Sequence, residues 1–565
     1  MNAQRTRRPF AHPVKESARE KGVTLFVATV SLVFLIPVVG LAVDVGFLYS
    51  VKARMQAAVD GAALGAARAL NLGQTTSSQA SAAQANAVNW FYANFPAAYM
   101  GTSSTVMSTG DVQVFDDPVN PLVRNVTVQA QTNVPTYFMR WLAVFFPSGQ
   151  YAYTTVRALG NAARRDVVVM LVLDRSGSMN SNSGCSNMRA AAKLFVGQFA
   201  NGRDRIGMVT FSDTVYMEQA PTQSFQTALG YTNSFGSGTG KIDAITCNDN
   251  TGIPQAVRIG YNELYKTALP GALNVMMFMT DGLPNTVTVD LKNSIDMPAA
   301  GTTITSGTGA GQSGTFSACQ DQNGRPANAL TPGARADFVN FPRKWNGSAI
   351  SMGTGSLLPT VPAGMIGAVG TGDVAGSATW GVRKFWATGT AGGYNHGTYT
   401  TTNAPGCVFP SNENNFSAVD VRGIPQVDVY GTSLTGYLST STRTVNGTTQ
   451  LRNDQFQTMV NAAFNASDNA AKAARTNATI PAYVFAVGLG GTTGSPPDYV
   501  LLQRMSNDPN GDLFNTPPLY PQCSADPTCT TSTNEPSGTF IFSSSPSQLG
   551  QAFLKISSMI LRLSR

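Results

Sequence analysis

The sequence has few of the side chains on which enzymes and nucleic-acid-binding proteins depend. Only 12% of its 565 residues are charged, and it contains two histidines. The net charge is +7, but the first 21 residues carry +4 of it, so no surface for nucleic acid is indicated. No H-E-x-x-H or G-x-S-x-G motif and no Cys/His pairing occurs. We therefore expect neither an enzyme nor a protein that binds a small-molecule substrate.

The chain does have one long apolar run, at residues 23–43. These 21 residues carry no charge, and as a helix they would span about 30 Å, the thickness of a bilayer core. A cleavable signal peptide is the alternative, but its apolar core is usually shorter, and no A-x-A-like site follows here. Basic residues precede the run, so the positive-inside rule places the N-terminus in the cytoplasm and the rest of the chain outside. We expect a single-pass anchor.

We expect the helix to continue beyond the membrane, with Asp44 at the outer interface. A stripe of small residues follows at helical spacing, which would either admit another helix or form an exposed stalk. Its members are Ala58, Gly61, Ala62, Gly65, Ala66 and Ala69. A second helix at 77–95 and alternating segments at 124–134 and 151–160 then predict a small α+β stalk with no chemical motif.

Strand and helix patterns alternate through the rest of the chain. Residues 167–173, VVVMLVL, are apolar throughout, as in a strand buried on both faces. Further strands are expected at 205–212, 274–280, 481–490 and 538–545. Helices are expected at 187–200, 251–265, 453–475, 498–505 and 546–563. This alternation predicts an α/β fold with a doubly wound, mostly parallel sheet of the Rossmann-like type.

Oxygen-bearing side chains stand at the ends of two of these strands. Asp174, Ser176 and Ser178 follow the first strand, and Asp281 follows another. Because such sheets form their sites at the carboxyl ends of strands, all four can converge on one point. Two carboxylates and two hydroxyls are hard donors that suit Mg²⁺, or Mn²⁺ or Ca²⁺, and not zinc. The alternative is a polar cluster that only caps the first helix.

The pattern Asp-x-Ser-x-Ser, then Thr, then Thr-Asp-Gly resembles the metal-ion-dependent adhesion site (MIDAS) of von Willebrand factor type A domains. The resemblance implies a threonine as the fifth ligand, with Thr251 the candidate and Thr246 a nearby competitor. It also implies that the serines and the threonine coordinate the metal directly and the aspartates mostly through water. One coordination position would stay open for a carboxylate of a partner protein.

A Gly/Thr-rich stretch at about 287–450 separates the strand before Asp281 from the next helix, and we expect an insertion that stands beside the metal. A glycine-rich segment at 488–494, GLGGTTG, is expected to be a plain loop because no helix opens directly after it. The six cysteines lack any C-x-x-C pair, which in an exported chain favours disulfides over zinc. The expected pairs are Cys185–Cys247, Cys319–Cys407 and Cys523–Cys529.

The whole arrangement resembles TadG proteins of the bacterial Flp/Tad pilus assembly system. The resemblance rests on the basic leader, the span that runs into LAVDVGFLYSVKARMQAAVDGAALGAARAL, the strand-rich stalk and the C-terminal type A domain. Val27 occupies the position of a prepilin's glutamate, so we expect no processing by a prepilin peptidase. The expected parts are a cytoplasmic leader at 1–22, a transmembrane helix at 23–48 within a TadE/TadG-like region that ends near 70, a stalk at 49–163 and a type A domain at 164–565.

The resemblance implies an inner-membrane protein whose bulk is periplasmic or extracellular and which helps to assemble or anchor a pilus. Its metal site would bind a carboxylate on a protein partner, another pilus-assembly component. The alternative function is a surface adhesin that binds host or matrix ligands through the same metal site.

Overall fold

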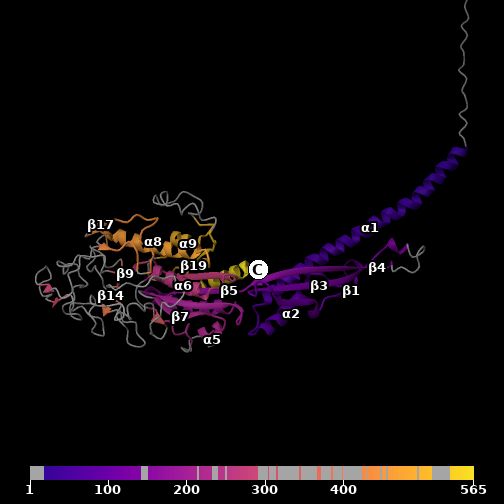
Figure 1. Ribbon diagram of the computed structural model, residues 1–565. Coiled ribbons are helices and arrows are strands. Elements are labelled where there is room, and N and C mark those ends of the chain that lie inside the picture. The colour runs from indigo at the N-terminus through magenta and orange to yellow at the C-terminus, as the bar shows by residue number, and fades with distance from the viewer. Residues whose placement is uncertain are drawn as a thin grey trace, which may run out of the picture. The chain divides into compact units, whose positions relative to one another are not determined.

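The computed structural model describes residues 18–141, 151–212, 215–231, 240–247, 251–290, 423–428, 430–445, 448–452, 456–492, 496–511 and 535–564, and short strands between 303 and 398. Contacts divide the chain into two compact units (Figure 1). The first unit comprises Met1–Ala69, Ser81–Phe115 and Asn125–Ala162. The second comprises Leu70–Ala80, Asp116–Arg124 and Ala163–Arg565.

The first unit is built on one long helix, α1 (Ala18–Ala69). Its apolar side chains between Val23 and Val45 are largely exposed, and α1 is a candidate membrane span by length and composition. A second helix, α2 (Thr76–Asn94), follows. The sheet of this unit pairs β3 with the other three strands. The strands are β1 (Ser103–Val106), β2 (Val112–Asp116), β3 (Val123–Pro135) and β4 (Tyr153–Arg165), with 3₁₀ turns η1 (Tyr99–Gly101), η2 (Thr109–Asp111) and η3 (Met139–Trp141).

The small-residue stripe of α1 is packed and not exposed. Ala58, Ala62 and Ala66 are at most 1% exposed. At Gly65, a Cβ atom would lie 2.6 Å from Cδ1 of Trp90 on α2, a distance that real side chains do not tolerate. The stripe therefore allows α2 to approach α1 closely, the first of the two alternatives that its sequence left open.

Asp44 is a buried structural acceptor within the first unit and is only 1% exposed. Its Oδ1 accepts the backbone N–H of Tyr137 at 2.9 Å, and its Oδ2 accepts those of Phe138 at 2.9 Å and Met139 at 2.7 Å. The ring of Phe138 covers Gly40, where an added Cβ would lie 2.5 Å from its Cδ1. One carboxylate on α1 thus fixes the backbone that enters η3, a role that its place in the sequence does not reveal.

We predict that Asp44→Ala loosens this segment, because three backbone N–H groups lose a charged acceptor at a cost of about 3 kcal/mol. Hydrogen exchange of the full chain in detergent should then be about 100-fold faster at the amides of Tyr137 to Met139. The control is Asp60→Ala, which removes an exposed carboxylate of α1 that bonds only to Gln56 among the contacts described. Equal exchange at these three amides in the two variants would contradict the role of Asp44.

The second unit contains a seven-stranded sheet in the order β12-β7-β6-β5-β8-β19-β20. Its strands are β5 (Val167–Asp174), β6 (Arg205–Phe211), β7 (Val215–Thr222), β8 (Leu273–Thr280), β12 (Arg343–Lys344), β19 (Tyr483–Leu489) and β20 (Phe540–Ser543). All neighbours are parallel except β6 and β7. The predicted doubly wound, mostly parallel α/β sheet is confirmed; the antiparallel strand β7 was not predicted.

Helices cover both faces of this sheet (Figure 1). They are α4 (Gly184–Val196), α5 (Phe225–Leu229), α6 (Ile253–Thr267), α8 (Phe456–Arg475), α9 (Tyr499–Ser506) and α10 (Leu549–Leu563), with 3₁₀ turns η4 (Gly177–Ser183) and η11 (Pro546–Gln548). One apolar core lies between the sheet and α6, α8 and α9, and another between the sheet and α4 and α10. Alternate residues of β5 enter the two cores, which explains why its sequence is apolar throughout.

Apart from β12, which joins the seven-stranded sheet, the described strands of the predicted insertion form small antiparallel sheets. They are β9 (Thr286–Asp290), β10 (Thr303–Ile304), β11 (Gly314–Thr315), β13 (Ile366–Gly370), β14 (Lys384–Phe385), β15 (Gly397–Thr398), β16 (Gly423–Ile424), β17 (Thr442–Val445) and β18 (Thr448–Arg452). The orders are β15-β14-β13-β9, β10-β11 and β16-β18-β17.

Asparagines of α8 hold the chain where it returns from this stretch. The amide of Asn465, which is fully buried, donates to the carbonyls of Leu434 at 3.2 Å and Leu438 at 2.8 Å and accepts the N–H of Leu438 at 2.9 Å. One turn later, Asn469 donates to the carbonyls of Ser433 and Thr435. Residues 433–438 are therefore bonded to α8 through their backbone groups. These contacts do not depend on which side chains the residues carry.

Candidate metal site

The sheet brings the predicted site residues to one edge. β5 and β8 are adjacent and parallel, with Leu173 opposite Met279, so both strands end at the same level. Asp174 is the last residue of β5, and Asp281 follows the last residue of β8. The loop after β5 turns at once into η4, which carries Ser178. This is the edge at which doubly wound sheets bind ligands.

Four of the five predicted residues form one hydrogen-bonded cluster. The backbone N–H of Ser176 donates to Oδ1 of Asp174 at 2.7 Å. The hydroxyls of Ser178 and Ser176 donate to Oδ1 of Asp281 at 2.8 and 3.3 Å and lie 3.1 Å from each other. Thr280 adds a hydroxyl that donates to Oδ2 of Asp174 at 2.5 Å, a contact that the sequence did not suggest.

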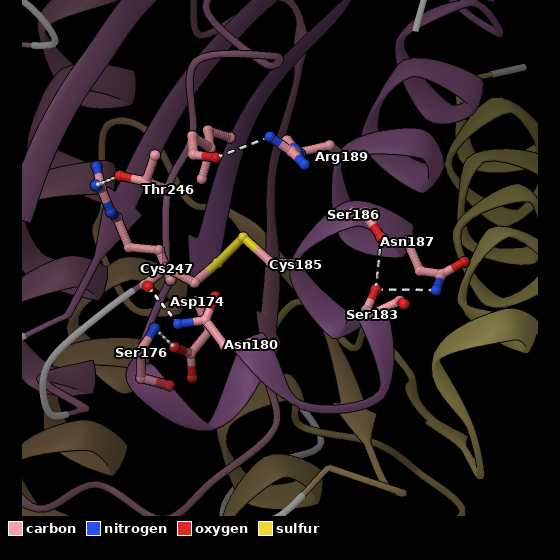
Figure 2. The surroundings of a disulfide bond; sticks show 12 residues. Asp174, Ser176, Asn180, Ser183, Cys185, Ser186, Asn187, Arg189, Thr246 and Cys247 are labelled. Carbon is pink, nitrogen blue, oxygen red and sulfur yellow. Dashed lines mark hydrogen bonds between the residues drawn. A yellow bond between two sulfur atoms is a disulfide. The ribbon is translucent and has the colours of Figure 1, made fainter. Parts of the chain in front are cut away.

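Thr251 is the threonine that lies beside this cluster. It is 5% exposed, and its Oγ1 is 3.7 Å from the position that a Cβ on Gly282 would take. Two hydrogen bonds with Asn285 fix the backbone of Thr251. The N–H of Thr251 donates to the side-chain Oδ1 of Asn285 at 2.8 Å, and the N–H of Asn285 donates to the carbonyl of Thr251 at 3.0 Å. The hydroxyl of the competitor, Thr246, instead accepts a hydrogen bond from Arg175 at 2.9 Å (Figure 2).

The two carboxyls are buried, and burial raises the pKa of both. Burial, and then the charge of Asp281, raises the pKa of Asp174 to about 7, against the hydrogen bonds from Ser176 and Thr280. Burial also raises the pKa of Asp281, against hydrogen bonds from Ser178, Thr492 and Ser176. In the described part of the chain, no arginine or lysine forms an ion pair with either carboxyl. Within the described residues, therefore, no cationic side chain offsets the charge that either carboxyl carries when it ionises.

The residues present fit a hard divalent cation. Oδ2 of Asp281 is buried and makes no hydrogen bond within the described residues. An unpartnered buried carboxylate oxygen is costly unless a ligand meets it. The other donors are hydroxyl and carboxylate oxygens, which suit Mg²⁺, Mn²⁺ or Ca²⁺. No three His, Cys, Asp or Glu side chains gather anywhere in the described ranges, so nothing there favours zinc.

A disulfide joins two of the loops at this edge (Figure 2). Cys185, in the first turn of α4, is bonded to Cys247, with their Cα atoms 6.2 Å apart, as the sequence analysis predicted. The amide of Asn180 also donates to the carbonyl of Cys247 at 2.6 Å. Both contacts fix Cys247, which comes four residues before Thr251 in the sequence. The other two predicted disulfides involve cysteines outside the described residues.

Arg175 lies within the Asp-x-Ser-x-Ser segment and is held by β7. Its guanidinium stacks 4.3 Å from the ring centroid of Tyr216 and lies 3.7 Å from Oε1 of Glu218. Burial raises the pKa of Glu218, while the hydroxyl of Thr210, donating at 2.7 Å, and the charge of Arg175 oppose the shift. The sequence analysis missed these contacts because it did not assign β7, and no motif marks Tyr216 or Glu218.

The fold of the second unit is that of a von Willebrand factor type A domain. A family model described as "von Willebrand factor type A domain" matches residues 169–283. A second model, described as "Putative Flp pilus-assembly TadE/G-like", matches residues 22–69. Together the two matches confirm the predicted resemblance to a TadG-like Flp pilus protein with a type A domain. They also favour a structural or adhesive role over catalysis.

Solved structures from pili are similar to this chain at low identity. The PilB minor pilin from Streptococcus sanguinis is 10% identical, with 83% of this chain and 80% of that chain covered and a TM-score of 0.29. The SpaC pilus adhesin from Lactobacillus rhamnosus GG is 13% identical, with 80% and 36% covered and a TM-score of 0.31. The vWF domain of the tip protein Mfa5 from Porphyromonas gingivalis is 15% identical, with 72% and 98% covered and a TM-score of 0.30. No significant match to a curated protein was found.

We predict that replacing Cys185 and Cys247 by serine together lowers the stability of the second unit. The bond closes a loop with a sequence separation of 62 residues, so its loss should lower the free energy of unfolding by about 4 kcal/mol. Thermal unfolding of the full chain in detergent measures the change. Reductant should lower the transition of the wild type more than that of the double variant. Equal stability of the two proteins without reductant would contradict the prediction.

Proposed function

We propose that the protein is a membrane-anchored cell-envelope component of Flp/Tad pilus assembly that binds a protein partner through a divalent cation. Residues that would hold Mg²⁺, or Mn²⁺ or Ca²⁺ in its place, are Asp174, Ser176, Ser178, Thr251 and Asp281. α1 would cross the inner membrane once, with the N-terminus in the cytoplasm. The stalk at 49–163 would carry the type A domain at 164–565 outside the cytoplasm.

The observation that carries this proposal is the buried pair of carboxyls at the ends of β5 and β8. Asp174 and Asp281 are both 0% exposed, and the burial of like charges without a cation destabilises a fold. A bound divalent cation supplies the missing positive charge and an open coordination position for an oxygen of another molecule. The chain's own oxygens come from three separate loops, which together would hold the cation, and a coordination position that they leave free would be open to a partner. A carboxylate is the partner group with matching charge and hardness.

The first test is thermal unfolding of Asp281→Asn in EDTA and in Mg²⁺. In EDTA the variant should be more stable than the wild type by about 1 to 2 kcal/mol, because one of two buried like charges is removed. Mg²⁺ at about 100 times its dissociation constant should stabilise the wild type by about 2.7 kcal/mol and leave the variant unchanged. Asp60→Asn is the matched control and should respond to Mg²⁺ as the wild type does. An equal Mg²⁺ response of Asp281→Asn and the wild type would refute the metal site.

The second test is capture of envelope proteins by the tagged full chain. The wild type and Asp60→Ala should retain a partner in Mg²⁺ and lose it in EDTA, whereas Asp174→Ala should retain it in neither. An identical partner set under all conditions would refute metal-dependent binding.

The same strains distinguish assembly from adhesion. Retention in the inner-membrane fraction and loss of pili on deletion would support a role in pilus assembly. Accessibility to external protease with pili intact would support a surface adhesin and contradict the assembly role.

A further inference from the structure

The segment that enters η3 lies beside the apolar run of α1. The ring of Tyr137 packs edge-on against Phe47, three residues after Asp44, with the ring centroids 5.4 Å apart. The ring of Phe138 packs against Gly40, four residues before Asp44. Seven residues of an α-helix rise by about 10 Å, so these two consecutive rings contact α1 at levels about 10 Å apart. Phe138 therefore lies beside the last turn of the uncharged run.

The sheet of the first unit leaves this level together with α1. The side chains of Lys52 and Gln56 donate to the carbonyls of Arg157 and Leu159 on β4, the second at 2.7 Å. Four residues of a helix and two of a strand both span about 6 to 7 Å, so β4 runs beside α1 in the same direction. Continued toward the N-terminus by the same steps, the first residue of β4 is level with Asp44. The N-terminal part of α1 extends beyond the sheet (Figure 1).

The side chains around the segment are aromatic or basic, and they are exposed. Tyr137 is 54% exposed and Phe138 is 42% exposed, and Tyr153, the first residue of β4, is exposed as well. The guanidinium carbon of Arg140, which is also exposed, lies 5.8 Å from the ring centroid of Tyr153. Aromatic rings and basic side chains with long apolar stems gather where acyl chains meet lipid headgroups. The composition therefore fits that boundary.

The hydrogen bonds to Asp44 make this segment compatible with lipid. Irregular backbone at membrane depth is tolerated only where its N–H groups find partners within the protein. A carboxylate at the edge of an apolar span is also costly unless it is paired or hydrogen-bonded. Here each group satisfies the other, because both oxygens of Asp44 accept N–H groups of the segment. In water, solvent would satisfy both groups, so the arrangement is needed only at a lipid boundary.

We propose that residues 137–140 are a second membrane contact of the first unit. Phe138 enters the acyl chains of the leaflet at the C-terminal end of the span, and Tyr137, Tyr153 and Arg140 lie among its headgroups. The contact adds to α1 and fixes the end of the sheet at the bilayer surface. The inference rests on the part of the proposed function that places α1 across the membrane.

Phospholipid is the occupant because the exposed apolar surface of α1 leads directly to Phe138. Val38, Leu41 and Val43 are each at least 49% exposed and lie within five residues of Gly40, against which Phe138 packs. A lipid that covers these side chains therefore also reaches the ring of Phe138.

The test places the photo-cross-linker p-benzoylphenylalanine at single positions of the full chain. The chain is reconstituted in vesicles of phosphatidylethanolamine and phosphatidylglycerol with radiolabelled acyl chains. Position 138 should take up at least about tenfold more label than position 115, because the probe reacts only with groups that it contacts. Hydrogen exchange at the amides of Tyr137 to Met139 checks that the segment keeps its bonds to Asp44. If the larger side chain disturbs the contact with Gly40, position 137 provides the second reading.

Phe115 is the matched control because it is similarly exposed but lies at the other end of the sheet. It is 45% exposed. Two residues later, the N–H of Asp117 donates to the carbonyl of Val123, the first residue of β3. The far end of β3, at Pro135, precedes the proposed contact, and twelve residues of extended strand span about 40 Å. Leu32, which is 54% exposed in the middle of the run, is the positive control.

The outcomes separate this inference from the proposed function. Label at position 32, with positions 137 and 138 no higher than position 115, would overturn the second contact and leave the anchor intact. A cross-link from position 138 to another protein chain, without lipid label, would assign the surface to a protein and also overturn the inference. Absence of label at position 32 would overturn the membrane anchor of the proposed function itself.

Discussion

The second unit depends on one constraint: two carboxyls are buried side by side at the ends of adjacent parallel strands. β5 and β8 cannot be neighbours in this register without bringing Asp174 and Asp281 together. Mutual repulsion and loss of hydration oppose the arrangement, as the raised pKa of Asp174 shows. Hydroxyl donors offset part of this cost but leave Oδ2 of Asp281 without a well-formed hydrogen bond among the described residues. Among the described residues, therefore, no cationic side chain forms an ion pair with the carboxyls at these strand ends.

The loops around these strand ends are restrained by contacts that do not touch the carboxyls. The disulfide and Asn180 hold Cys247, and through it the approach to Thr251. Asn285 holds Thr251 from the other side through two backbone contacts. A site with short hydroxyl side chains needs such support, because serine and threonine oxygens reach little beyond the backbone that carries them. Rigid loops, and not long flexible side chains, thus set the positions of the oxygens.

Features that a single segment encodes could be predicted from the sequence. The apolar run before Asp174 predicts a central strand, and the second strand before Asp281 predicts where the two ends meet. Contacts between distant segments could not be predicted, because periodicity carries no information on pairing. The amides that bond to Asp44 come from residues 93 to 95 positions away, and Asn182 meets Gly491 over 309 positions. The strand β7 was missed because its sequence, VYMEQAPT, is polar near one end and alternates weakly.

Buried carboxylates in this protein fall into two groups that hydrogen bonding separates. Asp44 accepts three backbone N–H groups, and Asp204, which is 0% exposed, accepts the N–H of Val167 and of Ala200 and the guanidinium of Arg164. In both, each oxygen has a donor, so nothing remains for a ligand to add. Asp281 is equally buried, but its hydrogen bonds are unevenly distributed. Two serine hydroxyls donate to Oδ1, and Oδ2 accepts no hydrogen bond within the described residues. Burial alone therefore does not distinguish Asp281 from Asp44 and Asp204; the oxygen without a hydrogen-bond partner does.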